Sequence, residues 1–254
     1  MIKDSILIQS FYQIGNYVSF TGRAFSKFPT IFKRFFEITK QIRTMGYDSL
    51  LLITVTSGFT GLVTAVQASY QTRGYIPSSL IGVMVGKSTM TELAPVLTGL
   101  VLSGKIGAAI AAEVGTMKVS EQLDSMMSMG VDPFDYLYLP RIIAGVIVLP
   151  LLTIYANLIS ILSAFFVSNI KYDTNTYTFF VNMKNHFQPL DLWGGLVKAF
   201  FFGLIITSIA CYAGSRAKGG AEGVGKVATL SVVYSAILIL LMDFVVAAIL
   251  FGRT

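Results

Sequence analysis

Long uninterrupted apolar runs are the feature that most constrains this sequence. No charged residue occurs between Asp48 and Arg73, and similar runs follow, each about as long as a membrane-spanning helix. Only 13% of all residues are charged, whereas soluble domains carry about 25%. A chain with so few charges cannot cover a water-soluble surface, and it is too apolar to be disordered. We therefore expect an all-α integral membrane protein rather than a cytosolic enzyme.

Five of the apolar runs are candidate transmembrane helices, with no second domain and no internal repeat. They cover residues 49–68, 77–103, 142–167, 192–213 and 227–251.

Residues 1–48 differ in character, because basic and aromatic side chains are mixed there. Leu7, Phe11, Ile14 and Val18 recur at helical spacing, which predicts one apolar stripe. We predict an amphipathic N-terminal segment that lies in the membrane interface, with its basic groups toward the lipid headgroups. The alternative is a soluble helical tail that packs on its own chain.

The positions of Lys and Arg predict the orientation in the membrane. With five spans, residues 1–48 and the loops at 104–141 and 214–226 share one side, and they contain 13 of the 19 Lys and Arg residues. Basic residues favour the cytoplasmic side, so we expect a cytoplasmic N-terminus and a C-terminus on the outer side of the membrane. Lys198 is placed near the membrane edge on the outer side.

Few residues suggest chemistry within the chain itself. One Cys and one His are too few for a zinc site built from those residues. Residues 82–88 and 220–226 imitate a phosphate-binding loop, but each lacks part of the motif and its strand–loop–helix context. The net charge of +6 is better explained by basic residues flanking the spans than by nucleic-acid binding. We predict no catalytic residue, no metal and no cofactor in this chain.

Charged residues inside spans are the strongest candidates for function, since each costs about 2.5–3.5 kcal/mol at a helix centre. Glu92 and Lys87 lie in the second predicted span, where Pro95 removes a backbone donor and can open room for a ligand. We interpret this patch as facing a cavity that accepts a charged lipid headgroup. The alternative is a structural ion pair, or Lys87 reaching the interface. The predicted substrate-binding residues are Lys87, Thr91, Glu92, Leu93, Val96 and Leu97.

Asp243 is a second acid, in the fifth span, and it leaves two other functions open. Glu92 and Asp243 would be relays in an ion- or proton-coupled secondary transporter. An intramembrane aspartyl hydrolase would need both carboxyls to share a proton at close range.

A short amphipathic helix is predicted within residues 120–130, in the loop between spans two and three. Ser120 is expected to cap it, with Glu121 and Asp124 in its first turn and Gly130 at its end. Its apolar face would fit a groove on a partner, although the same face would also rest on a membrane surface. Asp132 and Pro133 predict the start of another short helix. The predicted partner-contacting residues are Ser120, Glu121, Leu123, Asp124, Met126 and Met127.

Two segments resemble a known family. The segment from Thr91 to Thr153, which includes TELAPVLTG and SEQLDSMM, resembles the MlaE/YrbE permeases of ABC transporters that work with MCE proteins. The segment from Ala221 to Gly252, which includes Asp243, resembles the last span of that family. Thr91 and Ala94 depart from the family's usual R-E-L-G-P motif, whereas Glu92 matches it. The resemblance covers most of residues 49–254.

The resemblance implies a permease domain at residues 49–254 that forms a homodimer and moves phospholipid or a related lipid between the inner membrane and the cell envelope. It implies two cytoplasmic ATPase subunits that bind ATP and magnesium, and an MCE protein on the outer side. The SEQLDSMM helix would be the coupling helix that sits in the ATPase.

Overall fold

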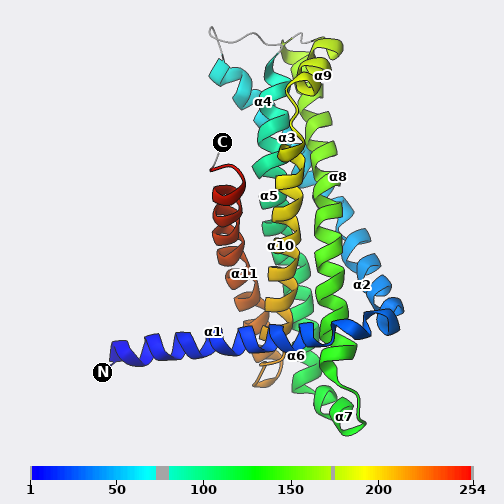
Figure 1. Cartoon of the computed structure of the whole chain (residues 1–254), viewed down its shortest axis with the longest axis vertical. Coiled ribbons are helices and arrows are strands. Elements are labelled where there is room, and N and C mark those ends of the chain that lie inside the picture. Colours follow the sequence, from blue (N-terminus) through cyan, green and yellow to red (C-terminus); the bar gives the residue numbers. More distant parts are fainter. Residues whose placement is uncertain (1, 73–79, 173–174, 253–254) are drawn as a thin grey trace. The chain divides into compact units, whose positions relative to one another are not determined.

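The computed structural model describes residues 2–72, 80–172 and 175–252, so that Arg73, Pro77 and Arg253 lie outside the described residues. Within these ranges the chain is almost entirely helical and contains no strand (Figure 1). The helices are α1 (Ile2–Ser26), η1 (Phe28–Arg34), α2 (Phe35–Tyr47), α3 (Leu50–Thr72), α4 (Ile81–Ser88), η3 (Thr89–Leu93), α5 (Ala94–Leu102), η4 (Ser103–Gly107), α6 (Ala108–Val119), α7 (Gln122–Ser128), η5 (Phe134–Tyr138), α8 (Leu139–Tyr172), α9 (Thr176–Asn185), α10 (Pro189–Gly214) and α11 (Gly220–Leu250).

Five helical runs in the described part of the chain are long and apolar enough to cross a membrane, which confirms the predicted fold class. They cover Leu50–Gln71, Ile81–Val119, Phe134–Lys171, Pro189–Gly214 and Gly220–Leu250.

Three of the predicted boundaries are wrong. The fifth run begins at Gly220 instead of Val227. The second run extends to Val119 instead of ending at Ser103, because residues 106–114 are mostly Ile, Ala and Val, and no Pro interrupts them. The third begins at Phe134 instead of Ile142, so Asp132 and Pro133 start a spanning helix rather than a separate short one. The Asp132 carboxylate accepts a hydrogen bond from the Phe134 amide at 3.0 Å, which satisfies one of the free donors at the helix start.

The chain forms two compact units, each assembled from three stretches of sequence. Unit 1 comprises residues 1–45, 103–145 and 204–235, and unit 2 comprises residues 46–102, 146–203 and 236–254.

In unit 1, helix α1 packs across the end of α10 and the start of the third spanning run (Figure 1). Phe20 contacts the rings of Phe134, Tyr138 and Tyr212, and Ala24 is fully buried one turn further on. Ile14 and Val18 lie on the opposite, exposed side of α1. The helix therefore has one apolar face that packs on its own chain and another that remains available to lipid.

In unit 2, α3 packs closely on α8, and α9 packs on α4 (Figure 1). A Cβ on Gly61 would overlap the Ser160 carbonyl group, and the Ser160 hydroxyl donates to the Ser57 carbonyl at 2.7 Å. Ala65, Ala68 and Ala164 are buried in the same core. Small side chains thus allow the two backbones to approach, as membrane helices require.

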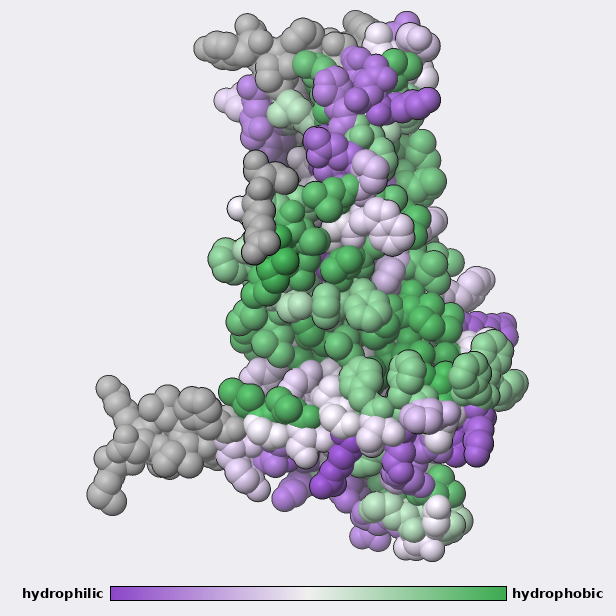
Figure 2. Space-filling view, in the orientation of Figure 1, coloured by the Kyte–Doolittle hydropathy of each residue, from purple (hydrophilic) through white to green (hydrophobic). Residues whose placement is uncertain are grey.

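Apolar surface covers much of both units. In unit 2 the hydrophilic residues gather around α9, and in unit 1 they gather around η1 and α7 (Figure 2). Leu51, Val55, Phe59 and Val63 are exposed along one face of α3 at intervals of four residues. Such a face requires lipid or another apolar surface against it.

Candidate functional site

A buried lysine joins three helices of unit 2. The Lys198 side chain is fully buried, and its Nζ lies 2.5 Å from a carboxylate oxygen of Glu92 and 2.8 Å from one of Asp243. The lysine belongs to α10, whereas the two acids belong to η3 and α11. The two carboxylates compensate the charge of the buried lysine.

Two adjacent glycines, Gly194 and Gly195, explain how Lys198 reaches both acids. A Cβ on Gly195 would overlap the carbonyl oxygen of Met90, in η3, and one on Gly194 would lie 2.7 Å from the Phe251 ring, beyond the end of α11. The absence of side chains lets α10 lie close to both neighbours. Lys198 follows Gly195 by about one turn and points to the same side.

A π-helical turn presents Glu92. In η3 the hydrogen-bonded turn is wider than in an α-helix, and the Ala94 amide bonds to the Thr89 carbonyl. Pro95 follows directly and has no amide proton to donate, which disfavours a regular α-turn there. The Glu92 side chain remains 43% exposed, although Lys198 behind it is buried. The pair thus consists of a fixed cation and a carboxylate that faces outward.

Glu92 faces a groove of about 740 Å³ between α3 and the α4–η3–α5 run. This volume lies within the range of about 300–1,000 Å³ that is typical of ligand sites. The exposed wall area is mostly apolar, and the polar groups are the Glu92 carboxylate, the amides of Gln67 and Gln71, and four hydroxyls, those of Thr60, Thr64, Ser88 and Thr91. The lining residues are Phe59, Thr60, Val63, Thr64, Gln67, Ala68, Gln71, Met84, Ser88, Thr91, Glu92, Leu93 and Leu97.

The groove brings together four of the six predicted substrate-binding residues, namely Thr91, Glu92, Leu93 and Leu97, but not Lys87 and Val96. The Nζ of Lys87 lies 3.9 Å from an Asp191 oxygen instead, so Lys87 does not replace the basic residue that is missing beside Glu92. The Thr91 hydroxyl donates to the Lys87 carbonyl at 2.8 Å, which leaves its oxygen as an acceptor.

Sequence reasoning missed Lys198 and the polar residues of α3. One signal was available for Lys198. Lys198 lies inside an apolar run, where a charge needs a partner of opposite sign. In the sequence analysis, neither Glu92 nor Asp243 had an established cationic partner. Nothing in the spacing of Gln67 and Gln71 indicated that α3 forms the opposite wall of the groove.

The ion cluster argues against an aspartyl hydrolase. Such an enzyme needs two carboxyl groups that share one proton. Here each acid instead lies within ion-pair distance of the Lys198 ammonium group, at 2.5 Å for Glu92 and 2.8 Å for Asp243.

In unit 1, the short helix α7 forms where it was predicted, but its start differs. The Ser120 hydroxyl bonds to the Thr116 carbonyl at 2.8 Å and ends α6, so Ser120 does not cap α7. The residue before α7 is Glu121, in the left-handed conformation with φ 59°. The chain therefore turns sharply between α6 and α7.

The end of α7 and its apolar face agree only in part with the prediction. Gly130 ends the helix with φ 76°, and the amides of Gly130 and Val131 bond back to the carbonyls of Met127 and Met126. Leu123 is 3% exposed, so it packs within its own chain. Met127 and Met129 are more than half exposed, which leaves them available to a partner.

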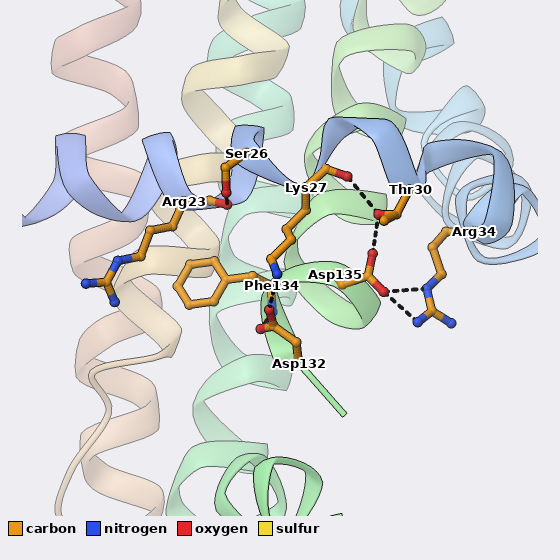
Figure 3. Close-up of polar contacts among 8 residues, drawn as sticks. All are labelled: Arg23, Ser26, Lys27, Thr30, Arg34, Asp132, Phe134 and Asp135. Atoms are coloured by element: carbon orange, nitrogen blue, oxygen red, sulfur yellow. Dashed lines mark hydrogen bonds and ion pairs between the residues drawn. The ribbon is translucent and has the colours of Figure 1, made fainter. Parts of the chain in front are cut away.

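A polar cluster attaches the N-terminal segment to the turn before α8 (Figure 3). The Arg34 guanidinium donates to one oxygen of Asp135 at 2.6 and 3.0 Å, and the Thr30 hydroxyl donates to the other. The Lys27 ammonium lies 2.9 Å from Asp132, and the hydrogen bond and charge of that carboxylate raise the pKa of Lys27. We call these residues, with Phe134, the N-terminal clasp.

Five apolar spanning runs, an intramembrane ion cluster and an apolar groove define a multi-pass membrane protein of the permease type. The sequence model of the family described as Permease MlaE matches residues 38–249, and the chain belongs to this family.

Named relatives agree with this assignment. A protein of Rickettsia felis named probable ABC transporter permease protein is 37% identical over 214 residues, which is 84% of this chain and 83% of the relative. The intermembrane phospholipid transport system permease protein MlaE of Haemophilus influenzae is 34% identical over 225 residues, 88% and 86% of the two chains. A probable ABC transporter permease of Synechocystis is 36% identical over 215 residues, covering 85% of this chain and 82% of the relative.

Proposed function

We propose that this chain is the membrane subunit of an ABC transporter that moves phospholipid, or a related lipid, between the inner membrane and the cell envelope. Membership of the permease family and the names of the relatives support this function over a secondary transporter. The observation that carries the proposal is the groove, whose shape and chemistry suit an amphiphile. Apolar walls accept acyl chains, while Glu92 and the two glutamines accept a headgroup.

ATP would be hydrolysed by separate subunits, because the chain has only incomplete phosphate-loop motifs. Two ATPase subunits would dock on α7 of a homodimer, with ATP and magnesium bound in the ATPases. The exposed Met127 of α7 and Met129 directly after it support this role, since Met side chains adapt to a partner groove. An MCE protein would bind on the outer side.

Residues 49–254 would then form the permease domain and residues 1–48 an interfacial segment. The exposed apolar faces of α3 and α11 provide surfaces for lipid and for a second copy of the chain. The excess of basic residues supports a cytoplasmic N-terminus and a periplasmic C-terminus.

The experiment is a lipid-transfer assay with the purified chain and the ATPase from the same genome. The complex is reconstituted in vesicles of phosphatidylethanolamine and phosphatidylglycerol that carry a fluorescent phospholipid. We expect ATP-dependent transfer, and Glu92→Gln should reduce both transfer and the lipid that copurifies. Transfer that requires a proton gradient but no ATPase would favour the secondary transporter.

Lys87→Gln is the matched control, because Lys87 lies on the same helical run but outside the groove. Both variants must first elute as the wild-type complex and retain the ATPase. If Glu92→Gln then shows wild-type lipid occupancy and transfer, the groove is not the lipid path.

A further inference from the structure

A second pocket, separate from the groove, lies in unit 1 beside α1. It measures about 190 Å³, below the range for drug-sized ligands and suited to a small polar group. Its walls come from α1, from the end of α10 and from Phe134. The lining residues are Asn16, Ser19, Phe20, Arg23, Phe134, Tyr212, Ser215 and Arg216, and no acid is among them.

Two arginines give this pocket its charge, and neither has an ion pair among the side chains that the structure describes. Arg216 lies over the Tyr212 ring, with its guanidinium carbon 4.5 Å from the ring centre. In Figure 3 the Arg23 side chain extends away from Asp132 and Asp135. Both arginines are exposed to solvent, so an anion from outside can reach them.

The two acids of a neighbouring pocket already have cationic partners. Asp124 and Asp132 line the larger pocket that shares Arg23, but Asp124 lies 3.0 Å from Lys118 and Asp132 lies 2.9 Å from Lys27. Their charges are thus largely compensated. The positive charge of Arg23 and Arg216 remains available to an external anion.

Neutral donors complete the lining. The Asn16 amide nitrogen is buried and has no hydrogen-bond partner among the described residues, which is costly unless a ligand or water supplies an acceptor. The Ser19 hydroxyl lies on the same walls, whereas the Ser215 hydroxyl there already donates to the Tyr212 carbonyl at 2.8 Å. Planar guanidinium groups with nearby amide and hydroxyl donors match the oxygens of a phosphate group.

We propose that this pocket binds a phosphate group, which bridges α1 to the end of α10. The phosphate is either that of an anionic lipid headgroup or a free phosphate ion, since both present the same oxygens. This site is independent of the transported cargo, because it lies outside the groove and involves none of its residues.

The test measures binding to the full-length chain, purified in detergent and stripped of lipid. One arm titrates phosphatidylglycerol and counts bound lipids by native mass spectrometry. The other arm adds inorganic phosphate, with chloride at equal ionic strength, and measures the melting temperature. Binding of the lipid alone identifies a headgroup site, whereas stabilisation by inorganic phosphate alone identifies an ion site, and either result supports the proposal.

Arg23→Gln and Arg216→Gln should each weaken binding by about fivefold, the effect expected for one basic residue near a membrane surface. Arg216→Lys should lose part of this affinity, because it keeps the charge but not the fork. Lys218→Gln is the matched control, since Lys218 is exposed in the same loop but does not line the pocket. An unchanged melting temperature without added ligand shows that each variant is folded.

One result overturns the proposal. If the double variant Arg23→Gln/Arg216→Gln binds phosphatidylglycerol and phosphate as tightly as the wild type, the pocket is not a phosphate site. The same holds if the wild type binds neither probe. Neither outcome bears on lipid transfer through the groove, so failure here is distinguishable from failure of the proposed function.

Discussion

Lys198 and Glu92 form an ion pair whose two members differ sharply in exposure. The lysine side chain is fully buried, whereas 43% of the glutamate side chain is exposed to the groove. Removing a buried charge partner typically destabilises by about 3–5 kcal/mol, because the remaining charge is left uncompensated. Here Glu92 and Asp243 would both lose their cation.

Lys198→Met should therefore lower the melting temperature by roughly 6–20 °C, on the scale that applies to domains of this size. The fluorescence of Trp193, the single tryptophan, reports the transition in detergent. Lys87→Met is the control, and it should change stability by less than about 1 kcal/mol because Lys87 is 42% exposed and 3.9 Å from Asp191. Equal losses in both variants would contradict the structural role of Lys198.

Gly195→Ala should disrupt unit 2, because the new Cβ would overlap the Met90 carbonyl oxygen. We expect low yield of folded protein and loss of the lipid that copurifies. Gly104→Ala provides the comparison, since nothing lies within 4 Å of a Cβ there, and Ala favours a helix over Gly by about 1 kcal/mol. If Gly195→Ala is as well folded as Gly104→Ala, then α10 does not lie this close to η3.

The N-terminal clasp should hold η1 in place. Asp135→Asn removes the negative charge of the carboxylate that accepts hydrogen bonds from Arg34 and Thr30. Hydrogen exchange at the amides of η1 should therefore become faster. A double-mutant cycle between Arg34→Gln and Asp135→Asn should give a coupling of about 1 kcal/mol. Lys33→Gln, which changes a neighbouring exposed residue, should leave the exchange rates unchanged, and additive effects in the cycle would exclude the contact.

The predicted orientation can be tested with single cysteines. Cys211 is buried, so Cys211→Ala provides a background with little reactivity. In this background Asn185→Cys, in α9, should react with an impermeant maleimide in intact spheroplasts, whereas Ser128→Cys, in α7, should react only after permeabilisation. The reverse pattern would invert the topology.

Docking of the ATPase should depend on the exposed residues of α7 and not on Leu123. Met127→Asp should abolish copurification of the ATPase, because it puts a charge in the centre of the proposed contact. Ser125→Asp adds the same charge at another exposed position and should have a smaller effect. Full retention of the ATPase by Met127→Asp would remove α7 from the docking surface.

The fold was largely predictable, because long apolar runs leave a chain few alternatives to helices. The end of span two and the start of span three were not predictable, since the polar residues at 104–141 suggested a loop. In span two, Ala-rich turns continue the helix instead. Part of the groove followed from one charged residue, Glu92, and its neighbours on the same face. Its opposite wall and Lys198 depend on which helices pack together, and that depends on glycine contacts such as Gly195 with Met90, which hydrophobic periodicity does not reveal.

The π turn at Thr89–Leu93 also rotates the rest of its helical run about the helix axis. Such a turn holds about one residue more than an α-turn, and one residue corresponds to about 100° of rotation about the axis. Every side chain after the turn is therefore rotated by that angle compared with an uninterrupted helix. A one-residue deletion in this stretch would hardly shorten the helix, but it would redirect Glu92 relative to Leu97 and so separate the groove's charge from its apolar wall.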